Sequence, residues 1–264
     1  MSKKIAVIGG GNLGSAIVEG LLKSGFSAPE DIIVTKRNVA TLASLKEKGV
    51  SVISDNNQAV RESELVILAI KPFQTKDVLE SIAADLTPRH ILVSVVTGVY
   101  IKDMHEVVKA DLPLFRAMPN TAIAIQESMT CISSAYASEE QINYVQGLFG
   151  TVGKVALIDE KLMDAATVLG ACGTAYAMRY IRANIQGGIE IGFDAATARL
   201  IAAQTVKGAA ELLLQKGSHP EQEIDKVTTP KGCTIAGLNE MEHQGFSSSL
   251  IKGISTSYNK IVKG

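Results

Sequence analysis

The sequence predicts an α/β fold in two parts, a doubly wound parallel sheet followed by an all-α region. Three observations predict it. Short apolar runs alternate with helix-like patterns up to about residue 158, glycines and polar turns separate them, and strand patterns stop beyond residue 160. A chain of 264 residues also exceeds one typical domain of roughly 100–200 residues. We therefore expect two domains, 1–158 and 159–264.

The strands of the first part are predicted from apolar runs. Ile5–Ile8 is apolar throughout, as expected of a strand buried on both faces of a parallel sheet. Similar runs predict further strands at 32–34, 50–52, 65–70, 91–96, 114–118 and 129–133. Apolar residues at helical spacing predict the intervening helices at 15–23, 39–48, 56–62 and 75–86, with Gly25 and Gly49 ending the first two. Such alternation is typical of a doubly wound sheet.

The second part is predicted to be helical throughout. Alanine-rich helices are expected at 161–184 and 195–216, and shorter ones at 234–244 and 247–262. Gly187, Gly188 and Gly192 are expected to lie in the connection between the first two of these helices. His219–Gly232, between the second and the third helix, has the composition of a turn region. The helix surfaces look too apolar to stand alone, which predicts dimerisation of helix against helix.

Composition excludes several classes of function. The charges nearly balance, with 26 basic and 27 acidic side chains and no long block of one sign, so nucleic acid is not an expected partner. Three scattered cysteines and four histidines show no metal-ligand spacing, and we expect no metal and no disulfide. No apolar stretch is long enough for a signal peptide or a membrane span, so we expect a cytoplasmic protein.

The glycines of Gly9–Gly14 have G-x-G-x-x-G spacing and stand between the first strand and the first helix. In that context Gly9 permits the tight turn, Gly11 lets the backbone approach a pyrophosphate, and Gly14 allows close helix packing. The helix N-terminus would attract the phosphates. The alternative is a glycine-rich turn that serves only close packing and binds no ligand. We predict a Rossmann-type dinucleotide site.

The end of the second strand indicates which dinucleotide binds. Sites for NAD usually place an Asp or Glu there, which accepts a hydrogen bond from the ribose 2′-hydroxyl. This chain has Thr35, Lys36 and Arg37, which can neutralise a 2′-phosphate. We therefore prefer NADP(H) over NAD(H), with a solvated basic turn as the alternative.

Two more loops leave the carboxyl ends of strands, where doubly wound sheets bind ligands. Lys71-Pro72 follows the fourth strand, and Val96-Thr97-Gly98 follows the fifth. Pro72 fixes the backbone of its loop, which could form a wall of the cofactor site. Taken singly, each loop could equally be an ordinary strand–helix connection.

Several motifs together identify a family. They are "IGGGNLGSAI", "AIKP", "RAMPNT", "AYA" and "VTTPKGCTIAGL", the last being similar to the pattern V-[ST]-[ST]-P-G-G-x-T-x-x-x-L. From end to end, the chain resembles pyrroline-5-carboxylate reductase. The resemblance implies reduction of 1-pyrroline-5-carboxylate to L-proline with NAD(P)H, in the last step of proline biosynthesis. It also implies a Rossmann domain and an α-helical substrate-binding domain that interlocks in a homodimer, which is often assembled further into a decamer.

The glycine motif and the resemblance together assign site residues. For the cofactor they are Ile8, Gly9, Gly10, Gly11, Asn12, Leu13, Gly14, Thr35, Lys36, Arg37, Asn56, Ala69, Ile70, Lys71, Pro72, Val95, Val96 and Thr97. For the substrate they are Asn120, Lys231, Gly232, Cys233 and Thr234. The resemblance implies an active site in the cleft between the domains, with a partner subunit as a candidate contributor.

Thr234 is the expected catalytic residue. Its hydroxyl would lie next to the imine nitrogen, where it can orient and relay a proton but is a poor independent acid. The alternative role is a helix N-cap, which is common for threonine after a Pro-Gly loop. Backbone N–H groups of Gly232 and Cys233 would bind the substrate carboxylate.

The chain departs from the family pattern at several positions. Gly170–Thr174 replaces S-G-S-G-P, Lys231 replaces a glycine, Lys226 replaces an asparagine, and Ala122 replaces a proline. These changes leave open which groups hold the carboxylate. They also keep open a second hypothesis, a protein that senses NADP without turnover.

Two enzyme classes with similar N-terminal turns are alternatives. In a β-hydroxyacid dehydrogenase a lysine does the acid–base work. Here Arg179 and Ala183 occupy the positions of that lysine and of its accompanying asparagine. Because an arginine cannot release a proton near neutral pH, this chemistry is disfavoured. An F420-dependent NADP reductase would not need the substrate loop.

Overall fold

The computed structural model describes residues 3–263, so the predicted domain ends at residues 1 and 264 lie outside the described residues. The chain divides into two compact units, with the division between Ala171 and Cys172. The first is α/β and the second is all-α, which confirms the predicted fold class. The last described strand ends at Leu157, whereas the domain boundary at residue 158 stays a prediction.

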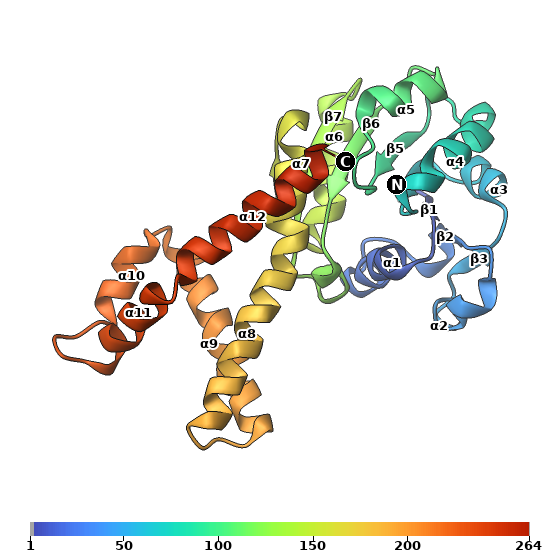
Figure 1. Cartoon of the computed structure of the whole chain (residues 1–264). Helices are drawn as coiled ribbons and strands as arrows, with labels where there is room; N and C mark the ends of the chain where they lie inside the picture. The colour runs from blue at the N-terminus through green and yellow to red at the C-terminus, as the bar shows by residue number, and fades with distance from the viewer. Residues whose placement is uncertain (1–2, 264) are drawn as a thin grey trace. The chain divides into compact units, whose positions relative to one another are not determined.

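The first unit is built on one sheet, in the order β3-β2-β1-β4-β5-β6-β7-β8 (Figure 1). Its described strands are β1 (Ile5–Ile8), β2 (Ile32–Thr35), β3 (Ser51–Ile53), β4 (Leu65–Leu68), β5 (Ile91–Ser94), β6 (Leu114–Met118), β7 (Ser128–Ala135) and β8 (Gly153–Leu157). Neighbours from β3 to β6 pair in parallel, β7 is antiparallel to β6, and β8 is parallel to β7. The carboxyl ends of β1 to β6 therefore meet at one edge of the sheet.

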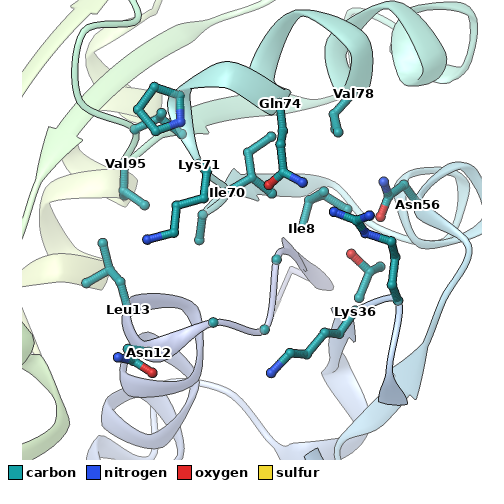
Figure 2. A pocket seen from close by; sticks show the side chains of 18 of the residues that line it. Ile8, Asn12, Leu13, Lys36, Asn56, Ile70, Lys71, Gln74, Val78 and Val95 are labelled. Atoms are coloured by element: carbon teal, nitrogen blue, oxygen red, sulfur yellow. The ribbon is translucent and has the colours of Figure 1, made fainter. Parts of the chain in front are cut away.

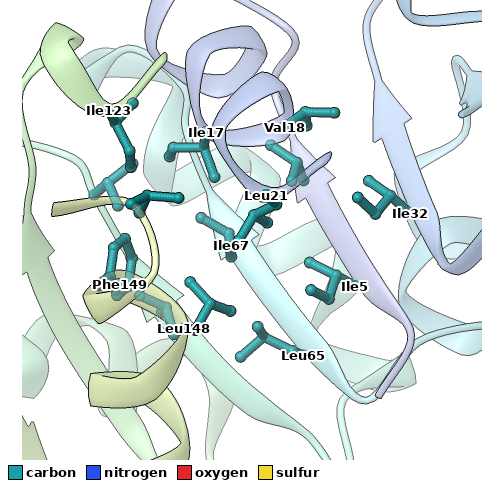
Figure 3. Close-up of a cluster of buried hydrophobic side chains, with 14 of the residues drawn as sticks. Ile5, Ile17, Val18, Leu21, Ile32, Leu65, Ile67, Ile123, Leu148 and Phe149 are labelled. Atoms are coloured by element: carbon teal, nitrogen blue, oxygen red, sulfur yellow. The ribbon is translucent and has the colours of Figure 1, made fainter. Parts of the chain in front are cut away.

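Helices cover both faces of this sheet, which explains why β1, β4 and β5 are buried throughout. They are α1 (Asn12–Ser24), α2 (Ala43–Glu47), α3 (Asn56–Arg61), α4 (Thr75–Ile82), α5 (Ile101–Val108) and α6 (Glu139–Gly150). Alternate strand residues such as Ile5 and Ile67 pack against α1 and α6 (Figure 3). The residues between them, such as Ala6 and Val66, pack against α3, α4 and α5.

The second unit contains the helices α8 (Gly173–Glu190), α9 (Ala195–Lys216), α10 (Pro220–Lys226), α11 (Cys233–His243) and α12 (Phe246–Lys263). Helices α8 and α9 pack closely, because a Cβ at Gly188 would lie 3.2 Å from the Ala198 Cβ. The Tyr176 hydroxyl donates to Ser257 Oγ at 2.7 Å and joins α8 to α12. Large apolar side chains of this unit remain exposed, among them Met178, Leu200, Leu214 and Ile251.

The predicted helix at 161–184 differs from the structure. The chain there forms a 3-10 turn, η6 (Glu160–Leu162), then α7 (Met163–Ala166), then a π-helical segment, η7 (Thr167–Cys172), before α8 begins. The prediction that Gly187 and Gly188 interrupt the connection is wrong, since both lie inside α8. Only the third glycine, Gly192, lies in the connection, with φ of 113°.

Three α-helices and one strand of the described residues were not predicted from the sequence. They are α5, α6, β8 and α10. The turn region expected at His219–Gly232 is partly wrong, because α10 occupies its first half. His219 caps α10 by accepting from the Glu221 N–H at 3.3 Å, and Pro220 is its first residue, where a missing N–H costs nothing.

Candidate functional site

A cavity of about 780 Å³ lies at the carboxyl ends of β1, β2, β4 and β5 (Figure 2). This volume is within the range of roughly 300–1,000 Å³ that is typical of ligand pockets. All the predicted cofactor residues except Gly14 line it. The lining residues that were not predicted are Asn38, Ser54, Gln74, Val78 and Thr121. The sequence-predicted residues are thus brought together from the ends of five strands, because Asn56 follows β3.

The space that a side chain would find differs among the three motif glycines, Gly9, Gly11 and Gly14. Gly9 has φ of 112°, and a Cβ there would lie 2.5 Å from the Ala69 carbonyl oxygen. A Cβ at Gly14 would overlap the Gly9 carbonyl. At Gly11 a Cβ would meet no atom within 4 Å, and φ is an ordinary −82°. Packing therefore requires glycine at positions 9 and 14 but not at 11, where the open space suits a ligand that approaches the backbone.

Helix α1 begins within the glycine turn Gly9–Gly14. Its N-cap is Gly11, which offers no side chain to the first N–H groups, and the first turn contains no acidic residue. The Ser15 N–H makes the first intrahelical bond, to the Gly11 carbonyl at 2.9 Å. An uncapped helix start of this kind presents N–H donors and a partial positive charge, which together favour a phosphate.

The electrostatics of the cavity favour a polyanion. Among the described residues, its lining includes three cations, Lys36, Arg37 and Lys71, and no aspartate or glutamate. Lys36 and Lys71 reach it from different loops (Figure 2). The end of β2 is fixed to the glycine turn, because the Gly9 and Gly10 N–H groups donate to the Thr35 carbonyl at 3.2 and 2.8 Å. The backbone that carries the cations after Thr35 is therefore attached to the glycine turn.

Asn120, a predicted substrate residue, is engaged in local structure. Its Oδ1 accepts from the Ala122 N–H at 3.0 Å and caps η5 (Thr121–Ile125), and its Nδ2 donates to the Gly170 carbonyl at 3.2 Å. The next residue, Thr121, lines the cavity. Asn120 thus lies beside the cavity and contacts the π-helical segment.

The other predicted substrate residues, Lys231 to Thr234, belong to the second unit. Gly232 is the N-cap of α11 and makes no side-chain cap, and a Cβ there would lie 2.5 Å from Thr229 Oγ1. Thr234 is partly buried and is the second residue of the helix. The alternative interpretation of Thr234 as the N-cap is therefore wrong, because Gly232 holds that position.

Lys231 has φ of 60° at a position where the family pattern has glycine. A left-handed conformation costs a non-glycine residue about 1–2 kcal/mol, part of which the greater flexibility of unfolded glycine offsets. We expect Lys231→Gly to raise the free energy of unfolding by about 1 kcal/mol, measured in urea at fixed protein concentration. A destabilised variant would mean that the Lys231 side chain makes a compensating contact.

Residues 3–263 lack two features. No helix in that range combines the length and apolar character that a membrane span requires. Within the same residues, no group of three or more His, Cys, Asp and Glu side chains is placed to hold a metal ion.

Family models match both parts of the chain. A model described as pyrroline-5-carboxylate reductase dimerisation matches residues 160–263. A model described as NADP oxidoreductase coenzyme F420-dependent matches residues 4–98, which contain the glycine turn and the cations after β2.

Curated and solved relatives extend over the whole chain. Pyrroline-5-carboxylate reductase 1 of Dictyostelium discoideum is 47% identical over 97% of this chain, which spans 49% of that protein's length. Pyrroline-5-carboxylate reductase 2 of the same organism is 42% identical, with 99% of this chain and 93% of the relative covered. The crystal structure of Plasmodium falciparum pyrroline carboxylate reductase with NADP bound is 25% identical, with a TM-score of 0.88 and coverage of 98% and 97%. This chain belongs to the pyrroline-5-carboxylate reductase family.

Proposed function

We propose that this chain is a reductase that converts 1-pyrroline-5-carboxylate to L-proline with NADPH, in the last step of proline biosynthesis. The observation that carries the proposal is the cavity at the strand ends. It combines an open glycine at Gly11 with three cations and, among its described lining residues, no carboxylate. Family membership supplies the substrate, since the relatives over nearly the whole chain bear the name of this activity.

The cavity suits NADP(H) better than NAD(H), although either reduced dinucleotide can supply the hydride for this reaction. Gly9–Leu13 and the start of α1 would hold the pyrophosphate, and Lys36 and Arg37 would neutralise the 2′-phosphate. Ala69–Pro72 and Val95–Thr97 would flank the nicotinamide end, with Asn56 beside the adenosine end. Without a carboxylate after β2, the site lacks the charged acceptor that NAD sites usually offer the 2′-hydroxyl, so NAD(H) would bind less tightly.

The dinucleotide, when bound, would supply a hydride for the imine carbon, and one proton on the nitrogen would complete the conversion of C=N to the CH–NH of proline. The chain's own residues must hold the ring and exclude other orientations. The N–H groups of Gly232 and Cys233, at the uncapped start of α11, would bind the carboxylate, with Lys231 adding charge. Asn120 would orient the substrate from the first unit, and Thr234 would hydrogen-bond the imine nitrogen and relay its proton.

The alternatives are less well supported. A β-hydroxyacid dehydrogenase would need a proton-releasing lysine where Arg179 stands. The F420-dependent model covers only the N-terminal residues, not the substrate loop. A sensor that binds NADP without turnover would keep the cavity but show no imine reduction.

We expect Thr234→Val, which is nearly isosteric, to lower kcat about tenfold and to leave the NADPH affinity unchanged, because an orienting hydroxyl contributes part of the proton transfer. Thr228→Val is the control, since the Thr228 hydroxyl already donates to the Ile224 carbonyl at 2.7 Å in the preceding helix. An unchanged kcat in Thr234→Val would remove Thr234 from the mechanism.

The second unit should assemble the chain into a homodimer, in which the exposed apolar residues of α8, α9 and α12 would be buried. We propose that these dimers assemble further into a decamer in the cytoplasm. Sedimentation equilibrium gives the stoichiometry directly, and a monomer at micromolar concentration would contradict the dimer.

The activity itself is tested by NADPH oxidation with racemic pyrroline-5-carboxylate, beside a blank and a panel of hydroxyacids assayed in the oxidative direction with NADP. We expect turnover with the imine alone. Activity only with a hydroxyacid would favour the dehydrogenase, and NADPH binding without turnover would favour the sensor.

A further inference from the structure

Arg116 is the largest fully buried side chain among the described residues, and the cofactor site does not use it. It lies in β6, in register with Ser94 of β5, and its side chain is only 2% exposed. A buried cation is costly unless carboxylates and hydrogen bonds compensate it. The residues that compensate the charge of Arg116 therefore indicate its structural role.

The partners come from two distant parts of the chain. Arg116 Nη1 lies 3.3 Å from Glu160 Oε1, and Nη2 lies 3.5 Å from Asp164 Oδ1. The Tyr100 ring stacks on the guanidinium, with 4.6 Å between the Arg116 Cζ and the ring centroid, and the Tyr100 hydroxyl donates to Asp164 Oδ2 at 2.8 Å. We call Tyr100, Arg116, Glu160 and Asp164 the Arg116 cluster.

Hydrogen bonds join members of the cluster to one another and to the start of α5. The hydrogen bond to Asp164 raises the pKa of the Tyr100 phenol, and burial raises it further, so the hydroxyl remains a donor. Glu160 Oε1 also accepts from the Ile101 N–H, the first of α5, at 2.7 Å. The cluster thus fastens η6 and α7 to β6 and to the start of α5.

The location of the cluster connects it to the cofactor cavity. Ser94, the register partner of Arg116, is followed directly by Val95–Thr97, which line that cavity. A dinucleotide with its pyrophosphate at the glycine turn and its 2′-phosphate after β2 would extend its nicotinamide toward β5 and β6. The cluster therefore stands beside the nicotinamide end.

The segment that the cluster attaches to β6 consists of η6 and α7. It stands at the start of residues 160–263, which the dimerisation family model matches. Every predicted substrate residue other than Asn120 follows it in the chain. Asn120 itself makes a second attachment to the same segment, through the Gly170 carbonyl. The start of this region is thus held at two points by residues of, or just after, β6.

We propose that Arg116 is a positioning residue of the reductase: it anchors residues 160–167 beside the nicotinamide end of the cavity, and imine turnover depends on that anchor whereas dinucleotide binding does not. This inference rests on the proposed function. Arginine suits the role because its planar fork reaches two carboxylates while its face stacks on a ring, neither of which a lysine reproduces.

The test uses Arg116→Lys and Asp164→Asn in the full chain, beside Asp159→Asn as the matched control. Asp159 directly precedes that segment and is exposed, and it pairs with Lys161 instead of Arg116: it accepts from the Lys161 N–H at 3.0 Å and lies 2.9 Å from the Lys161 Nζ. Lysine keeps the buried charge and asparagine keeps the side-chain shape, so both variants should fold. The measurements are the dissociation constant for NADPH, kcat and KM for the imine, and hydrogen exchange of the backbone amides.

In Arg116→Lys and Asp164→Asn we expect kcat/KM for the imine to fall about tenfold or more, while the NADPH dissociation constant stays within about twofold. Exchange should rise in residues 160–167 but not in 5–14, and Asp159→Asn should behave as the unaltered chain. Unchanged turnover, or a loss of NADPH affinity that parallels the loss of turnover, would overturn the proposal. If the unaltered chain does not reduce the imine, the proposed function and the dependence of turnover fail together, and the exchange pattern alone then decides whether the anchor exists.

Discussion

Replacing Gly11 by alanine is expected to weaken NADPH binding about 100-fold while leaving the protein folded. The methyl group meets no protein atom within 4 Å, so it adds no strain beyond a small loss at the N-cap of α1. It would enter the open space where the proposed site holds the pyrophosphate against the helix N-terminus. The measurement is a fluorescence titration with NADPH, accompanied by a thermal melt.

Two other glycines provide the controls. Gly147, in α6, also has open space around a Cβ, so Gly147→Ala should change neither NADPH binding nor folding beyond a slight stabilisation. A methyl group at Gly14 would overlap the Gly9 carbonyl, so Gly14→Ala should unfold at lower temperature. NADPH binding of undiminished affinity in Gly11→Ala would contradict the location of the site.

The second large effect concerns the choice of dinucleotide. Removing both cations after β2, in Lys36→Ala/Arg37→Ala, should weaken NADPH binding about 100-fold and leave NADH binding nearly unchanged. Each charge-assisted bond to the 2′-phosphate is worth about 1.5–3 kcal/mol at most, and solvent around these partly exposed side chains lowers that value. The measurement is the ratio of the NADPH and NADH dissociation constants.

Lys71 supplies the matched control for that ratio. It lines the same cavity from the loop after β4, away from the end of β2. Lys71→Ala should therefore weaken both dinucleotides by a similar factor and leave the ratio unchanged. Equal losses of NADH and NADPH in the Lys36/Arg37 variant would show that these cations do not recognise the 2′-phosphate.

The buried strands of the first unit could be predicted because each is a short apolar run between turns. Other elements lack that signal. Strand β8 is only partly buried at the edge of the sheet, so its apolar pattern is weak. Helix α6 has a different sequence signal, a capping box. The Gln141 N–H donates to Ser138 Oγ at 3.3 Å, and the Ser138 N–H donates to Gln141 Oε1 at 2.8 Å. The S-x-x-Q pattern of this box was visible in the sequence. The π-helical segment at Thr167 has no known single-sequence signature and was not predicted.

The residues that line the cavity could be predicted because parallel strands bring their carboxyl ends to one edge, so motifs far apart in sequence meet there. Ser54, at the end of β3, follows from the same rule and could have been included. Gln74 and Val78 could not, because they reach the cavity from the helical turns after Pro72 rather than from a strand end. The substrate residues came only from the family resemblance and stay predictions.

The Arg116 cluster was beyond sequence reasoning for a different reason. Its ion pairs join residues 44 and 48 positions apart, and an arginine inside an apolar strand does not name its partners. Only the fold shows that the start of α5 and the segment after β8 meet at this strand. The register then pairs Arg116 with Ser94, the residue before the cavity-lining Val95–Thr97.

The most direct test of the central claim follows the hydride itself. The purified chain is incubated with racemic pyrroline-5-carboxylate and NADPH that carries deuterium at both C4 positions of the nicotinamide, and the proline formed is analysed by mass spectrometry and NMR. We predict L-proline with one deuterium on the carbon that was the imine carbon, and almost none formed by Gly11→Ala at the same NADPH concentration. Proline without deuterium, or no proline from a chain that binds NADPH, would contradict the account.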